Sequence, residues 1–94
     1  MTEPLSPQEI QQALDALPEW HLEEGFLVRR LQFPDFREAM AFVLRMAFVA
    51  EAQRHHPELH NVYNRVRLRL STHEAGDRVT AKDVKLARAI ENLL

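Results

Sequence analysis

The sequence contains no cysteine among its 94 residues, which excludes disulfide bonds, thiolate nucleophiles and cysteine-ligated zinc. Its only two glycines are Gly25 and Gly76, so neither a P-loop nor a GxGxxG dinucleotide motif can form. No apolar run reaches the ~18 residues of a transmembrane helix. The first residues are acidic and polar, unlike a signal peptide. We therefore expect a cytoplasmic protein that does not associate with a membrane.

The remaining composition is typical of one globular domain that spans residues 1–94. Hydrophobic residues make up 46% of the chain and charged residues 28%, an ordinary balance for a folded protein. The length also falls near that of a single domain. A net charge of −2 provides no general attraction to nucleic acid, so we do not expect a nucleic-acid partner.

The first third of the chain predicts a helix followed by a hairpin. Ser6, Pro7 and Glu9 form a helix start with an N-cap, a proline at the first position and a capping box. Pro18 then ends this helix. Residues 20–24 and 26–33 are predicted strands, and Gly25 between them is typical of a hairpin turn.

A long helix is predicted from Asp35 to about Arg54, and its surface is apolar on nearly every side. Further apolar residues (Phe42, Leu44, Phe48 and Val49) lie outside its main stripe, which comprises Phe36, Ala39, Met40, Val43, Met46, Ala47 and Ala50. Such a helix is buried on more than one side. A domain this small has little chain to cover it, so we expect a homo-oligomer, either a dimer or a tetramer. The alternative is a helix sandwiched within one monomer.

Residues 61–71 give the clearest strand pattern, and Thr80 and Asp83 begin a final helix with a capping box. One side of the strand carries Val62, Val66, Leu68 and Leu70, and the other carries Tyr63, Arg65, Arg67 and Arg69. The element order is therefore α-β-β-α-β-α. It indicates an α+β fold with an antiparallel-rich sheet of three to four strands and helices on one face.

The histidines are the strongest candidates for catalytic or binding residues, because His55, His56 and His60 lie within six positions. Glu51 and His55 are four residues apart near the end of the long helix, so the carboxylate can orient the imidazole. His73 follows the predicted strand. If this strand returns beside the helix, His73 and His55 meet, and two imidazoles suit the transfer of protons to and from a substrate.

Other interpretations remain open at this level. The histidines can be ordinary surface residues, and His21 is expected to be structural. A metal site would draw on His55, His56, His60, His73, Glu51, Glu58 and Glu74, but their spacing lacks the helical pattern of a zinc motif, so we expect no metal. The Arg65, Arg67 and Arg69 side of the strand can contact phosphates, but in an acidic chain it is more simply a solvated face or an oligomer contact.

A longer pattern becomes recognisable when these residues are taken together. Glu51-x3-His55-His56-Pro57 is followed by Tyr63, His73 and Asp83 at fixed spacing, and this signature resembles that of the pterin-4a-carbinolamine dehydratases. The segments NVYNRVRLRLSTHEAG and KDVKLARAIE are similar to the third strand, active-site loop and last helix of that family. The likeness extends from about residue 8 to 94. Leu59 and His60 depart from it, since many members carry Trp and another aromatic there.

The resemblance implies an enzyme that eliminates water from 4a-hydroxytetrahydropterin, gives quinonoid dihydropterin and needs no cofactor. Such an enzyme recycles the tetrahydropterin of aromatic amino-acid hydroxylases. It implies that His55 and His73 are the acid–base pair, that Glu51 orients His55 and that His56 helps to bind the pterin. Asp83 occupies the last motif position, where it serves the site or caps the helix. Further residues implied to line the pocket are Pro57, Thr72, Glu74 and Ala75. The alternative is a non-catalytic assembly or transcription-coactivator protein on the same fold.

Overall fold

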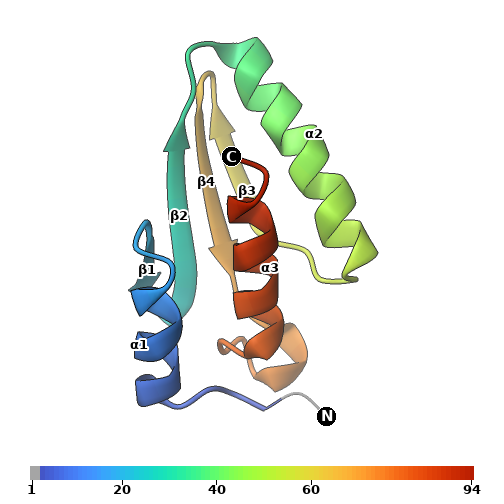
Figure 1. The fold of residues 1–94 in the computed structure, drawn as a ribbon. Coiled ribbons are helices and arrows are strands. Elements are labelled where there is room, and N and C mark those ends of the chain that lie inside the picture. The colour runs from blue at the N-terminus through green and yellow to red at the C-terminus, as the bar shows by residue number, and fades with distance from the viewer. Residues whose placement is uncertain (1–2) are drawn as a thin grey trace.

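A computed structural model describes residues 3–94 of the chain and shows helices packed on one face of a single sheet (Figure 1). The elements in order are α1 (Pro7–Asp15), β1 (Trp20–Glu23), β2 (Phe26–Gln32), α2 (Phe36–Ala52), β3 (Glu58–Val62), β4 (Arg65–Leu70), the 3₁₀ turn η1 (His73–Ala75) and α3 (Ala81–Glu91). Within residues 3–94, no helix combines the length and apolar character needed to cross a membrane.

The sheet has four strands in the order β1-β2-β4-β3, and every neighbouring pair is antiparallel. The predicted α+β class is therefore confirmed, and the sheet has the larger of the two expected strand numbers. The predicted element order is one strand short, because the observed order is α-β-β-α-β-β-α.

The extra strand arises because the predicted strand 61–71 contains a turn. Tyr63 has a φ of +51°, a left-handed conformation that no extended strand accommodates. The side-chain amide of Asn61 donates to the carbonyl oxygens of Tyr63 and Arg65, at 3.2 and 2.9 Å, and so holds the turn. The side of the strand that faces the core was predicted correctly after the turn, where Val66, Leu68 and Leu70 are buried. It was predicted wrongly before the turn, because Val62 on β3 is 45% exposed.

The local signals for the other turns and helix starts are confirmed. Glu24 and Gly25 both have positive φ, +50° and +84°, which suits the tight hairpin that joins β1 to β2. Ser6 and Thr80 each cap a helix, and both capping boxes are formed, with Glu9 and Asp83 respectively. Because these features depend on a few adjacent residues, the sequence was sufficient to place them.

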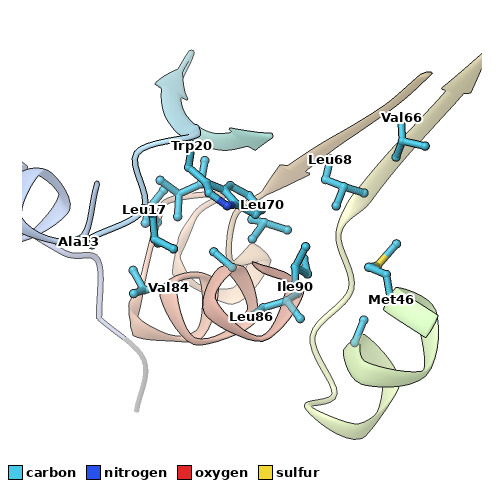
Figure 2. Packing of buried hydrophobic residues seen from close by; sticks show 14 of the residues in the cluster. Ala13, Leu17, Trp20, Met46, Val66, Leu68, Leu70, Val84, Leu86 and Ile90 are labelled. Atoms are coloured by element: carbon cyan, nitrogen blue, oxygen red, sulfur yellow. The ribbon is translucent and has the colours of Figure 1, made fainter. Parts of the chain in front are cut away.

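The core lies between the helices and the sheet. Figure 2 shows Trp20, Leu70, Leu86 and Ile90 gathered around α3, with Met46 of α2 approaching from the side. The indole N–H of Trp20 is not left unpaired, since it donates to Oε1 of Glu91 at 2.8 Å. Members of the core with no exposed surface include Leu27, Ala39, Phe42, Leu68, Leu86, Ala87 and Ile90.

Helix α2 is buried along one stripe only. Its buried residues are Ala39, Phe42, Met46 and Ala50, so the core-facing side is rotated from the predicted stripe and includes Phe42. The opposite side leaves Leu44 59% exposed and Phe48 72% exposed. A helix sandwiched within the monomer, the alternative considered from the sequence, is therefore wrong.

Leu86→Ala tests the position of the core. Because Leu86 has no exposed surface, this truncation is expected to lower the free energy of unfolding by about 2–5 kcal/mol. The neighbouring and exposed Lys85→Ala is the control, with an expected change within ~0.5 kcal/mol. Urea denaturation at one fixed protein concentration measures both. Equal unfolding midpoints for the two variants would contradict the packing described here.

Candidate active site

A buried carboxylate, that of Asp83, joins the segments that carry the candidate histidines. One oxygen lies 2.5 Å from Nε2 of His55, and the other accepts hydrogen bonds from the hydroxyl of Thr72 and the backbone N–H of Thr80, both at 2.8 Å. Asp83 and both threonines have no exposed surface. Asp83 therefore caps α3 and also contacts His55. The sequence alone did not show which of these two roles Asp83 has.

His55 reaches Asp83 because the chain turns sharply after α2. The helix ends at Ala52, and Arg54 adopts a left-handed conformation with a φ of +53°. The backbone N–H of His55 then donates to the carbonyl of Ala50 at 3.1 Å. This turn directs His55 inward, where it is 8% exposed.

The expected contact between Glu51 and His55 is wrong. Oε1 of Glu51 lies 2.8 Å from Nε2 of His56, and both side chains are exposed. The four-residue spacing applies only within a continuous helix, and α2 ends before His55. Asp83, 28 residues further along the chain, takes the orienting position that was assigned to Glu51.

His73 begins the 3₁₀ turn η1, and its side chain is 96% exposed. Its Nδ1 lies 3.0 Å from Oδ1 of Asp77. An ionised carboxylate only accepts hydrogen bonds, so Nδ1 carries the hydrogen and Nε2 is left for other partners. The preceding residue, Thr72, is bonded to Asp83, so the buried network fixes the start of the segment that holds His73.

His56 and His73 face one hollow of about 410 Å³, at the end of the sheet where β4 leaves it. This volume lies within the range of roughly 300–1,000 Å³ that is usual for small-molecule sites. The hollow combines imidazoles, carboxylates and a guanidinium with an aromatic ring. Its lining comprises Phe26, His56, Pro57, Glu58, Arg69, Ser71, His73 and Asp77.

Only some of the residues predicted to line the pterin site border this hollow. Pro57 lines the hollow together with His56 and His73, whereas Thr72 lies buried behind it. Glu74 and Ala75 do not line this hollow.

The pKa of the Glu74 carboxyl is held below its usual range. The larger cause is a hydrogen bond from the backbone N–H of Glu74 itself, and the charge of Lys82 adds to it.

Several lining residues were missed because only the folded sheet brings them together. Arg69 places its guanidinium carbon 4.0 Å from the centre of the Phe26 ring, and one of its nitrogens lies 3.2 Å from Glu58. These residues come from three strands. Asp77 is the exception, because it follows His73 by only four positions in the loop, and this short spacing is visible in the sequence.

The chemistry available in the site is that of proton transfer. Within residues 3–94, no group of three or more His, Asp or Glu side chains is arranged to hold a metal ion. Because a carboxylate oxygen accepts hydrogen bonds, Nε2 of His55 is the donor to Asp83, and Nδ1 is the nitrogen left to exchange a proton. A carboxylate that fixes the tautomer and orientation of an imidazole is a recurring feature of acid–base sites.

Comparisons with known proteins identify the family of the chain. Residues 3–93 match the family described as "Pterin 4 alpha carbinolamine dehydratase". A protein of Opitutus terrae named "Putative pterin-4-alpha-carbinolamine dehydratase" is 53% identical over 89 residues, which cover 95% of this chain and 92% of that protein. A protein of the same name from Rhizorhabdus wittichii is 48% identical over 93 residues, 97% of this chain and 95% of its own.

A solved structure shares the fold. The "transcriptional coactivator/pterin dehydratase from Brucella Melitensis" superposes with a TM-score of 0.90 and 37% sequence identity, and the match covers 96% of this chain and 97% of that one. The sequence match and the shared fold both extend over nearly all of the chain. The chain therefore belongs to the pterin 4 alpha carbinolamine dehydratase family.

Proposed function

We propose that the protein catalyses the elimination of water from 4a-hydroxytetrahydropterin to give quinonoid dihydropterin, and so supports the recycling of tetrahydropterin. The main support is the hollow that His56 and His73 line, with the His55–Asp83 pair in the adjoining chain segment. Family membership supports the same reaction. The imidazoles of this site supply the groups that such a reaction needs.

The reaction requires two proton transfers and no change of oxidation state in the protein. The bond from the 4a carbon to its hydroxyl oxygen breaks, and the oxygen takes a proton as it leaves as water. The adjacent ring nitrogen loses its proton, and its electrons form the new carbon–nitrogen double bond. One imidazole that donates and one that accepts therefore suffice, each contributing about 10²–10⁴-fold.

We assign the two transfers to His73 and His55, with His56 as a pterin contact. His73 has a free Nε2 at the rim of the hollow, because Asp77 occupies Nδ1. His55 has Nδ1 free, because Asp83 occupies Nε2. Glu51, bonded to His56, becomes a residue that positions the pterin contact rather than His55.

The wild-type protein is expected to accelerate 4a-carbinolamine dehydration in buffer that contains EDTA. His73→Ala is expected to lower kcat by about 100-fold or more, the loss of one acid–base group. The measurement is the rate of quinonoid dihydropterin formation from freshly generated substrate. Because the His73 side chain is 96% exposed, its removal should leave the unfolding midpoint unchanged.

His21→Ala is the matched control, since His21 is an exposed histidine on β1 away from the hollow, and it should keep the wild-type rate. His55→Ala should lower kcat as His73→Ala does, whereas His56→Ala should chiefly raise KM. A wild-type rate equal to the uncatalysed rate would instead favour the alternative, a non-catalytic binding protein. The name of the Brucella structure gives both a transcriptional coactivator and a pterin dehydratase.

Asp83→Asn tests whether the buried carboxylate positions His55. Asparagine has one acceptor oxygen in place of two, and the backbone N–H of Thr80 needs it, so the amide N–H₂ of the variant faces His55 and cannot accept the hydrogen of Nε2. The His55 ring must then change tautomer or lose the bond. We expect a lower kcat, a loss of about 1–3 kcal/mol in unfolding free energy and altered ¹⁵N shifts of the His55 ring. Asp77→Asn, at an exposed carboxylate beside His73, is the control for stability. Unchanged ring shifts in Asp83→Asn would refute the positioning role.

We also propose that α2 pairs with α2 of a second copy of this chain to form a homo-oligomer. Leu44 and Phe48 are large apolar residues four positions apart on the side of α2 away from the core, and they are 59 and 72% exposed. Their spacing places them along one stripe. A symmetric pair of such helices buries the same stripe from both sides.

Phe48→Glu is expected to convert the oligomer to a monomer, because a carboxylate would be buried in the helix pair. Light scattering at micromolar concentration measures the mass. Gln12→Glu adds the same charge at an exposed position of α1 and should leave the mass unchanged. A monomeric wild-type protein would overturn this proposal, and a stripe that binds a different protein would then be the remaining explanation.

A further inference from the structure

The face of the sheet opposite the helices carries a row of arginine and histidine side chains that the proposed reaction does not use. Arg30, Arg67 and His60 are direct cross-strand partners on β2, β4 and β3, so all three side chains point from the same face. Arg65 lies on that face at the next alternate position of β4. Like charges directly opposite one another destabilise a sheet, so the packing of the fold does not account for this row.

Only some arginines on this face are neutralised. Arg30 forms two hydrogen bonds with Glu23, at 2.6 and 2.8 Å, and these hold the pKa of the Glu23 carboxyl below its usual range. Arg69 pairs with Glu58. Within residues 3–94, Arg67 forms no ion pair, and its buried Nε has no hydrogen-bond partner. Buried donors of this kind normally have a partner.

Arg67 also lines a second hollow, of about 500 Å³, together with Arg30, His60 and Arg65. Its lining shares no residue with that of the hollow at the candidate active site. Arg67 and Arg69 are alternate residues on β4, so they lie on one face about 6.6 Å apart along the strand. Arg69 lines the first hollow and Arg67 the second.

We propose that the hollow around Arg67 is a subsite for an anionic substituent, a phosphate or a carboxylate, on the side chain of the pterin substrate. This inference rests on the proposed dehydratase function and narrows its substrate class. With the pterin ring between His56 and His73, a side chain that extends along β4 toward Arg67 meets the unpaired guanidinium. The planar fork of an arginine suits both oxyanions, through two parallel N–H···O bonds.

The test compares three 4a-hydroxytetrahydropterins: one with a neutral hydroxylated side chain, one with a phosphorylated side chain and one with a carboxylate on the side chain. For wild-type protein, kcat/KM should be about tenfold higher for at least one anionic substrate, and the two anionic forms distinguish phosphate from carboxylate. Arg67→Gln should raise KM for that substrate about tenfold, the loss of one charge-assisted contact, and leave kcat unchanged. KM for the neutral substrate should change less than twofold.

Arg88→Gln is the matched control, because it removes an exposed arginine from α3, on the helical side of the molecule. Arg67→Lys should retain only part of the preference for the anionic substrate, because an ammonium group lacks the planar fork of the guanidinium. Equal kcat/KM for neutral and anionic substrates, or an equal effect of Arg67→Gln on both, would overturn the subsite while leaving the dehydratase function intact.

If no substrate is turned over, the proposed function fails, and calorimetric titration with an oxidised pterin that bears the phosphorylated or the carboxylated side chain decides the subsite. Binding that is weakened about tenfold by Arg67→Gln supports the subsite, and binding with the same affinity in wild type and Arg67→Gln overturns it. Salt-dependent binding of an oligonucleotide, lost in Arg67→Gln, with no preference among the pterins would assign this face to nucleic acid instead and overturn the subsite.

Discussion

The burial of the Asp83 carboxylate constrains much of the structure around the site. A carboxylate without solvent contact is stable only if hydrogen bonds replace its water, and the chain provides donors from His55, Thr72 and Thr80. These donors come from the end of α2, the end of β4 and the start of α3. The same bonds that offset the desolvation of one charge therefore hold three elements in a fixed relation.

Features that depend on adjacent residues were predictable from the sequence, whereas those that depend on the exact point of a turn were not. The capping box at Thr80 and the hairpin at Gly25 are encoded by neighbours in the chain. The turn at Tyr63 interrupts a regular alternation of apolar and charged residues, and no glycine or proline marks it. The side chain of Asn61 supplies its hydrogen bonds instead, and an asparagine alone is a weak signal.

The same limit applies to the candidate site. The motif spacing was enough to select His55, His56 and His73, but the partner of each histidine depends on where α2 ends. A left-handed Arg54 reverses the expected pairing, so that Glu51 contacts His56 and Asp83 contacts His55. Arg69 and Phe26, which meet across the hollow, come from separate strands, and only the sheet register brings them together.

The regular rise of β4 has a consequence for ligand length. Arg67 and Arg69 border different hollows on one strand, and two residues of extended chain span about 6.6 Å. A molecule that contacts both must be at least that long and lie parallel to the strand. Shorter molecules occupy one hollow at a time. The backbone geometry of one strand, rather than the chemistry of any side chain, thus sets the minimum size of a ligand that bridges the two.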